Sequence, residues 1–196
     1  MKKVMFGLIM FVLAVCANAN DTYKDGTRCL CDSIHRIYYE SGAIMDETPY
    51  KNGKENGIAK SYYESGDIMW EIPYKNGKEN GIEKGYYESG ALWGETPYKN
   101  DKLNGIQKGY YASGALKWET PYENDKRNGI EKGYYESGAL KEETPYENDQ
   151  RNGIQKGYSE SGEIESTAIY KNGILQGYKH CSDGRIGNGD LDCSVQ

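Results

Sequence analysis

The polar and apolar positions of this chain repeat with a period of 24 residues. A Tyr-Tyr pair followed by x-Ser-Gly starts at residues 38, 62, 86, 110 and 134, and a copy with one Tyr starts at 158. A third Tyr keeps the same period, at Tyr50, Tyr74, Tyr98, Tyr122, Tyr146 and Tyr170. A fixed period between about 20 and 50 residues is typical of repeat architectures. The regular units therefore predict an array of small, nearly identical elements.

Each unit predicts a β-hairpin. In residues 129–152, apolar and polar positions alternate along Ile130–Glu136 and again along Ala139–Tyr146, with the turn signal Ser137-Gly138 between them. Two extended runs joined by a tight turn are typical of a hairpin. The early return loops contain Asn-Gly twice, and this pair supplies positive φ values. Later loops replace the first Gly by Asp, so we expect that position to be less strict about backbone conformation than the second.

Alternation along the second strand separates two faces. The second residue after the turn Gly is apolar, Thr or Ile usually stands four residues further on, and Tyr six further on, so we expect this face to be packed. Glu and Pro occupy the opposite face, where the regular Pro predicts a strand end or a bulge. A Lys row on the first strands is expected to pair with the Glu row across the sheet. These rows are Lys60, Lys84, Lys108, Lys132 and Lys156, and Glu47, Glu71, Glu95, Glu119 and Glu143.

These patterns predict an all-β fold, an elongated solenoid of stacked antiparallel β-hairpins in a single long twisted sheet. Two strands per unit advance such a rod by roughly 10 Å per repeat. The composition agrees, because the chain has 19 Tyr but only 2 Phe, 37% hydrophobic residues and a mean hydropathy of -0.87. Tyr suits a thin sheet, since its ring packs while its hydroxyl is satisfied by water or backbone.

The unit Gly-Ile-x-Lys-Gly-Tyr-Tyr-x-Ser-Gly-Ala-Leu-x-x-Glu-Thr-Pro-Tyr-x-Asn resembles the bacterial variant of the MORN repeat, over about residues 33–187. The resemblance implies a hairpin solenoid that acts as a scaffold or protein-interaction module. The pattern Tyr-Tyr-x-x-x-Gly-x-Leu/Ile-x-x-x-Thr is also similar to choline- or glucan-binding cell-wall repeats. Those repeats are shorter and carry Trp on the first strand, so this resemblance ranks second.

Two positions after the turn Gly depart from the repeat. The third reads Met45, Met69, Trp93, Lys117, Lys141 and Glu165, and the fourth reads Asp46, Trp70, Gly94, Trp118, Glu142 and Ser166. Exposed aromatic residues and Met are enriched at interfaces, so Trp70, Trp93, Trp118, Met45 and Met69 are the candidate binding residues. The alternative is that the Trp side chains fill gaps in a thin core. Alternation places Trp70 and Trp118 on one side and Trp93 on the other.

The first 19 residues read as a secretory signal peptide. Lys2 and Lys3 precede an apolar run that is too short for a bilayer span of roughly 20 residues, and Ala17-Asn18-Ala19 predicts cleavage after Ala19. The alternative is a lipoprotein signal with Cys16 as the lipidated residue, although Val15 stands where a small residue is expected. We therefore expect a periplasmic or secreted protein.

Four cysteines remain after cleavage, in an N-terminal cap (residues 20–32) and a C-terminal cap (residues 179–196) that flank the repeats of residues 33–178. They are Cys29, Cys31, Cys181 and Cys193. An even count in an exported chain indicates disulfides. A long rod keeps the ends apart, which predicts a Cys181–Cys193 bond and leaves Cys29 and Cys31 to pair with each other or with another molecule. Cys29-x-Cys31 followed by His35 lacks a fourth zinc ligand, so no metal site is expected.

No catalytic motif is present in the sequence, and the Glu residues come as repeat rows in which no copy is singled out. The mature charge of 22 minus 30, or -8, disfavours nucleic acid, and no segment after the leader is apolar enough to span a membrane. We predict a non-enzymatic exported scaffold or protein-interaction module that needs no cofactor. Carbohydrate or cell-wall binding through the aromatic rows is the alternative, and an edge-paired homodimer stays open.

Overall fold

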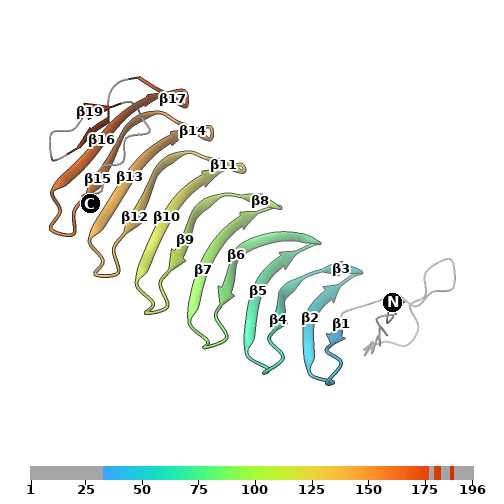
Figure 1. Cartoon of the computed structure of the whole chain (residues 1–196). Helices are drawn as coiled ribbons and strands as arrows, with labels where there is room; N and C mark the ends of the chain where they lie inside the picture. The colour runs from blue at the N-terminus through green and yellow to red at the C-terminus, as the bar shows by residue number, and fades with distance from the viewer. Residues whose placement is uncertain (1–32, 177–178, 182–185, 188–196) are drawn as a thin grey trace, which may run out of the picture.

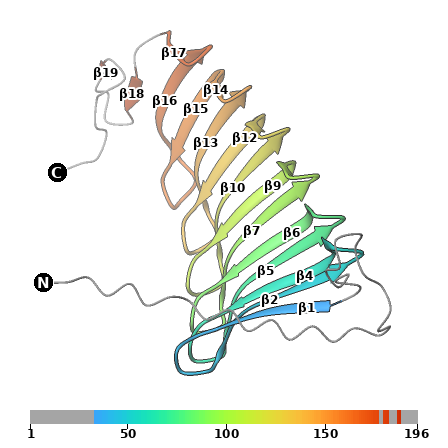
Figure 2. The same ribbon diagram turned by 90° about the vertical axis from the view of Figure 1, so that its right-hand side faces the viewer.

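The computed structural model describes residues 33–176, 179–181 and 186–187. Its strands form one antiparallel sheet, in which each strand pairs with its neighbours along the chain (Figure 1). The sheet is elongated, and successive hairpins are rotated relative to one another (Figure 2). The predicted all-β solenoid of stacked hairpins is confirmed. The signal sequence, Cys29, Cys31 and Cys193 lie outside the described residues, so cleavage and disulfide pairing stay predictions.

Each unit of 24 residues contains a first strand and a second strand. The first strands are β1 (Ser33–Tyr38), β4 (Gly57–Tyr62), β6 (Lys78–Tyr86), β9 (Gly105–Tyr110), β12 (Gly129–Tyr134) and β15 (Gly153–Tyr158). The second strands are β2 (Ile44–Lys51), β5 (Ile68–Lys75), β7 (Leu92–Lys99), β10 (Leu116–Glu123), β13 (Leu140–Glu147) and β16 (Ile164–Lys171).

Short strands complete the return turns and the C-terminal end. They are β3 (Lys54–Glu55), β8 (Lys102–Leu103), β11 (Lys126–Arg127), β14 (Gln150–Arg151), β17 (Ile174–Leu175), β18 (Lys179–Cys181) and β19 (Ile186–Gly187). The backbone of Cys181 pairs with Ser166 of β16, so β18 continues the sheet beyond the sixth unit.

The return turns explain the different tolerance of the two Gly positions. Asn52 and Gly53 have φ values of 52° and 72°, and Asp101 takes φ 66° at the position of Gly53. Asp visits this left-handed region with little penalty because its short side chain bonds locally. The later Gly has φ near +125°, which side chains rarely adopt, and a Cβ on Gly129 would lie 2.7 Å from Cγ of Pro121. Only Gly fits this second position.

The regular Pro lies at an irregularity of the sheet, as its missing N–H predicts. In β5 the pairing with β6 shifts between Glu71 and Tyr74, on either side of Pro73. The carbonyl of the Pro still accepts a hydrogen bond, since the backbone amide of Asn128 donates to the oxygen of Pro121 at 3.0 Å. Of the two predicted outcomes, a strand end or a bulge, the β5–β6 pairing shows the second, and the strand continues through the Pro.

Strand pairing defines the two faces of the sheet. On the face that we call the ridge face, Glu119 lies opposite Lys108 and Pro121 opposite Ile106; on the other, the groove face, Thr120 lies opposite Gln107. The groove face is the more tightly packed, because Thr120 and Thr144 are buried. On the ridge face three of the expected Lys–Glu pairs form, at 3.5 to 3.8 Å, whereas Lys84 and Lys108 of the same row are in none of the ion pairs found in residues 33–176. Such part-exposed pairs each stabilise the sheet by less than about 1 kcal/mol.

Tyr hydroxyls connect neighbouring units in both directions. The second Tyr of a unit donates to the backbone carbonyl of the first Tyr of the next unit, as Tyr63 does to Tyr86 at 2.8 Å. The first Tyr donates to the ridge Glu of the preceding unit, as Tyr110 does to Glu95 at 2.8 Å. Burial, with the adjacent carboxylate, raises the pKa of Tyr110 to about 12. Tyr39, Tyr111 and Tyr135 make the same forward bond, and Tyr62, Tyr86, Tyr134 and Tyr158 the same backward bond, so most hydroxyls of both rows are satisfied within the sheet.

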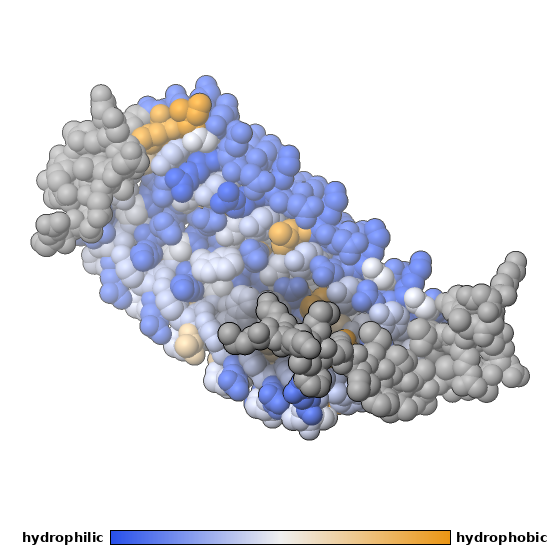
Figure 3. Space-filling model, turned by 45° about the vertical axis from the view of Figure 1, so that its right-hand side comes forward, coloured by the Kyte–Doolittle hydropathy of each residue, from blue (hydrophilic) through white to orange (hydrophobic). Residues whose placement is uncertain are grey.

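A row of Ile residues on the ridge face is half exposed, which the sequence analysis did not anticipate. Its members, between 44% and 52% exposed, are Ile34, Ile58, Ile82, Ile106, Ile130 and Ile154. Each of these Ile residues pairs with the ridge Pro of its hairpin, except that Ile154 pairs with Ile169 in the sixth unit. The face visible in Figure 3 is mostly hydrophilic, with separated hydrophobic residues.

Gly129→Ala is expected to destabilise the sheet by about 1–3 kcal/mol, because the new Cβ meets Pro121 and the backbone stays in a strained region. Urea unfolding followed by circular dichroism measures this change.

The matched control is Gly77→Asp. Asp101, at the same position one unit later, accepts a hydrogen bond from the amide of Glu79 at 2.8 Å. Gly77→Asp is therefore expected to keep or raise stability. Equal unfolding midpoints for Gly129→Ala and the unmodified chain would contradict the assignment.

Candidate functional site

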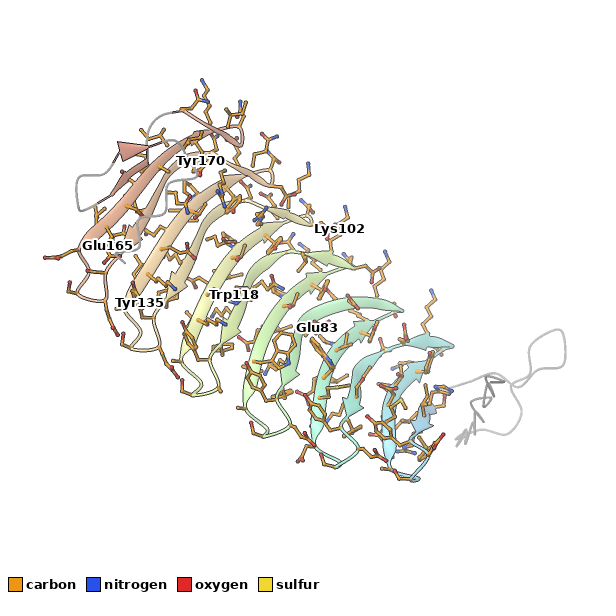
Figure 4. All side chains as sticks on the ribbon, in the orientation of Figure 1. Glu83, Lys102, Trp118, Tyr135, Glu165 and Tyr170 are labelled. Atoms are coloured by element: carbon orange, nitrogen blue, oxygen red, sulfur yellow. The ribbon has the colours of Figure 1, made fainter. Side chains whose placement is uncertain are left out.

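The groove face is hollowed in its C-terminal half. A depression of about 350 Å³ is lined by Tyr135, Arg151, Gln155, Glu165 and Tyr170, among others. A second hollow, of about 380 Å³, lies between Trp118, Tyr122 and Glu131. Glu83, Trp118, Tyr135 and Tyr170 mark the course of this face along the sheet, whereas Lys102 projects from the edge formed by the return turns (Figure 4).

A β-bulge in every unit brings the two variable positions together. In the fifth unit Gly133 pairs with Glu142 and Tyr134 with Leu140, so Lys141 has no partner of its own. Lys141 and Glu142 nevertheless both line the C-terminal hollow, beside Tyr135. A bulge places two residues opposite one and re-aims a side chain. Consecutive residues of the second strand therefore contribute to the same face.

The bulge overturns the expected position of Trp93. Alternation placed it opposite to Trp70, but the rings of Trp70 and Trp93 are in contact, 4.9 Å apart and nearly perpendicular at 86°. Gly85 pairs with Gly94 and Tyr86 with Leu92, which leaves Trp93 as the extra residue. The period-2 rule fails here because the bulge interrupts it. We find the Trp residues on one face.

The Trp rings of the third and fourth units lie over glycines. A Cβ on Gly85 would lie 2.5 Å from the Trp93 ring, and Gly109 holds the ring of Trp118 in the same way. Trp70, Trp93 and Trp118 are half-buried, so part of each ring reaches solvent. One side of the Trp93 and Trp118 rings fills the space above a glycine, as the gap-filling alternative predicts. The solvent-exposed part of the three rings corresponds to the expected Trp patch.

Met45 and Met69 occupy the extra position of the bulge in the first and second units, and both are half-buried. In the first unit, the hydroxyl of Ser61 donates to Asp46, the other variable position, at 2.5 Å. The five candidate residues thus lie along the bulge row of the first four units.

In the C-terminal units the groove supplies its own cations to its Tyr rings. The Lys117 ammonium lies 5.5 Å from the ring centre of Tyr111, and Lys141 lies 5.6 Å from Tyr135. A second pair of contacts has the same form, with Arg127 at 4.0 Å from Tyr146 and Arg151 at 5.1 Å from Tyr170. Cation–π contacts of this kind each contribute about 0.5–1 kcal/mol at exposed sites.

In the N-terminal units the corresponding positions are acidic. Glu55 lies opposite Tyr50 and Glu79 opposite Tyr74, where the fourth and fifth units have Arg127 and Arg151. The Tyr74 hydroxyl lies 3.5 Å from Glu79. Burial, with the charges of Glu79 and Glu55, raises the pKa of Tyr74 to about 12.

Glu83 completes this acidic region. Burial, and secondarily the charge of Glu79, raises the pKa of Glu83, and burial with the Asp101 charge raises the pKa of Glu79. The ion pairs found in residues 33–176 do not include Glu55, Glu79 or Glu83. These carboxylates are held together without a compensating charge.

The sequence analysis missed Glu55, Glu79, Glu83, Arg127 and Arg151. The signal was present, since these positions also differ between copies in register. In the sequence, however, the return segment looks like a polar loop, and only strand pairing shows that its alternate residues face the groove.

Within the described ranges, no His, Cys, Asp and Glu side chains are grouped in a way that could hold a metal ion. The same part of the chain contains no helix with the length and hydropathy needed to span a bilayer. The part-exposed Trp and Tyr rings and the charged side chains of the groove offer contacts for binding.

The fold defines a β-hairpin repeat solenoid with a variable groove. Comparison with known families agrees: the MORN repeat variant matches residues 32–52, 55–76, 79–100, 103–124, 127–148 and 151–172. The chain belongs to this family, so it is a repeat-based interaction or binding module of a generally non-enzymatic class. No curated protein matches the chain.

Glu83→Gln is expected to raise stability at pH 7, by about 0.5 kcal/mol or more. The raised pKa of Glu83 means that its contribution to stability is full below the unfolded pKa of about 4.3 and is lost as the pH rises through the folded pKa. The variant should therefore gain in thermal midpoint at pH 7 and lose that gain near pH 3.

Glu88→Gln, in the exposed turn of the same unit, is the control and should change neither midpoint. A Glu83→Gln variant that is less stable than the unmodified chain at pH 7 would show that the carboxylate stabilises the groove.

Proposed function

We propose that this chain is an exported, non-enzymatic scaffold that binds a partner protein through the bulge row of its first four units. Its first 19 residues support export, since they have the charge, length and cleavage pattern of a signal peptide. The regular Glu and Lys rows support a structural role for the ridge carboxylates, because Glu71, Glu119 and Glu143 are paired across the sheet.

The observation that carries the proposal is that the fold does not require Trp in the groove. The fifth unit builds the same bulge with Lys141 and Glu142, and the sixth with Glu165 and Ser166. Trp70, Trp93 and Trp118 are nevertheless present, half-buried and on one face. Large aromatic residues that the backbone does not need are typical of the energetic centre of a protein interface.

The test exchanges residues between units, so that the variant keeps side chains the repeat already tolerates. Trp70→Glu, Trp93→Lys and Trp118→Glu together give the second to fourth units residues that the fifth unit has at the same register. The tagged chain and this variant are used to capture partners from envelope extract of the source organism. We expect a partner held by the unmodified chain to bind the variant at least about tenfold more weakly.

The control carries Glu165→Lys and Ser166→Glu in the sixth unit, which also adopts fifth-unit residues and should retain the partner. Circular dichroism should be the same for all three proteins. A specific partner that binds the Trp variant with unchanged affinity would contradict the proposal, as would the absence of any saturable partner.

Carbohydrate binding is the second candidate function. It is favoured by the C-terminal hollow, where the rings of Tyr135 and Tyr170 lie with Arg151, Gln155 and Glu165. Aromatic faces beside hydrogen-bonding groups suit sugars, which are apolar on their ring faces and polar at their edges. Titration with soluble cell-wall fragments, followed by calorimetry, tests this reading. Heat that is lost in Tyr135→Ala supports it, and no heat with the unmodified chain excludes it.

A further inference from the structure

The charges of the groove face are separated along the solenoid. Five rows face the groove, and the fourth unit illustrates them. They are the paired bulge positions (Lys117 and Trp118), the Thr row (Thr120), the row opposite Thr (Gln107), the row of the last Tyr of each unit (Tyr122) and the row opposite that Tyr (Arg127). In the first three units these rows contain Asp46, Glu55, Glu79 and Glu83, with no Lys or Arg. In the last three units they contain four basic residues against three acidic ones: Lys117, Arg127, Lys141 and Arg151, and Glu131, Glu142 and Glu165. The formal charge changes from -4 to +1.

The two halves differ in what lies next to their Tyr rings. Tyr146 and Tyr170 have Arg127 and Arg151 over them in the C-terminal half. In the N-terminal half, Glu55 stands at the position of Arg127 relative to Tyr74, and Glu79 stands at the same position relative to Tyr98. In the C-terminal half, arginines of the chain itself lie over the Tyr rings. In the N-terminal half, glutamates occupy the arginine positions, so the Tyr rings lack a cation of their own and have carboxylates near them.

The second Tyr row shows the same difference. Lys117 lies over Tyr111, whereas the residue at its register in the third unit is Trp93, which does not supply a positive charge. Tyr87 of this unit is 40% exposed, and the Trp93 and Trp70 rings, which contact each other, also reach solvent. Trp is the aromatic residue that attracts cations most strongly. The aromatic and acidic residues of this half therefore favour the same ligand charge.

The fold does not require these carboxylates. Gln107 and Gln155 occupy the position of Glu83 in other units, and Leu103 occupies the position of Glu79. Like charges that raise one another's pKa destabilise a folded protein at neutral pH. The fifth unit also has an acid, Glu131, at the position of Glu83, but the row of Glu55 and Glu79 contains no acid in the C-terminal half. Retaining acid in that row only beside Glu83 is understandable if a bound group of opposite charge compensates it.

From these observations, and on the basis of the proposed function, we infer that the partner supplies an extended basic segment that lies along the first three units of the groove. Its Lys or Arg side chains contact the open Tyr and Trp faces and pair with Glu55, Glu79 and Glu83. These side chains would lie over Tyr rings, as Arg127 and Arg151 lie over Tyr146 and Tyr170 within the chain. Lys51 and Lys54 do not compete, because they flank the Tyr50–Glu55 pair and so face the ridge side.

The repeat length sets the spacing of the basic residues. Two strands per unit advance the groove by roughly 10 Å, and three residues of a polyproline II segment make one full turn over about 9 Å. A segment in this extended conformation that runs along the solenoid therefore presents every third side chain to equivalent positions of consecutive units. Basic residues three apart fit Glu55 and Glu79, which are also one unit apart.

The experiment measures binding of a fluorescein-labelled peptide, (Lys-Leu-Ser)₄, to the purified chain by anisotropy. Two peptides serve as controls, one with Glu in place of Lys and one of identical composition with the lysines in a single block. We expect the Lys peptide to bind at least about tenfold more tightly than the Glu peptide and several-fold more tightly than the block peptide, with affinity falling as salt rises.

The protein variant is Glu79→Gln with Glu83→Gln, and its matched control is Glu64→Gln with Glu88→Gln, in the exposed turns of the second and third units. The groove variant should bind the Lys peptide about tenfold more weakly. The turn variant should stay within about twofold of the unmodified chain. Equal binding of Lys and Glu peptides, no binding of the Lys peptide, or equal effects of the two variants would overturn the inference.

The same variants separate this inference from the proposed function. A captured partner that is lost with the Trp exchanges but binds Glu79→Gln with Glu83→Gln normally would leave the scaffold role intact and overturn the basic segment. A partner insensitive to the Trp exchanges would overturn the proposed function itself.

Discussion

The structure depends on a constant register between neighbouring hairpins. A single-layer sheet has little interior, and in residues 33–176 the fully buried side chains are few and mostly small. Stability must therefore come from contacts that each unit repeats with the next. The Tyr hydroxyls are the clearest example, because one row donates forward to a backbone carbonyl and the other donates backward to a carboxylate. Any change of register would break both rows at once.

This constraint limits where the chain can vary. Gly and Pro of the return turn, the two Tyr rows and the paired Lys and Glu hold each hairpin on its neighbour. The bulge positions and the alternate residues of the return segment do not take part in that contact. They therefore carry Trp, Met, acid or base without altering the backbone. The groove acquires its chemical character from residues that the solenoid itself leaves free.

Much of the fold could be predicted from the sequence. The period, the hairpin turns, the Pro irregularity and the Lys–Glu pairing follow from residues whose conformations are narrow: Gly, Asn-Gly, Pro and alternating β-formers. The site was predicted less well. The candidate Trp and Met residues do lie along the groove, but alternation gave the wrong side for Trp93, since a bulge shifts the side chains that follow it. Glu55 and Glu79, opposite Tyr50 and Tyr74, lie in return segments that the sequence predicts as polar loops.

The sequence by itself determined that this protein is a solenoid of six hairpins, because a 24-residue period with fixed Gly and Tyr admits few other structures. It also identified which positions vary. Only the tertiary structure decided which varying positions share a face. Pairing between strands brings Glu79 next to Tyr74, and Trp70 next to Trp93, although the members of the second pair belong to different units. Such neighbours depend on register and bulge geometry across strands, which local sequence does not encode.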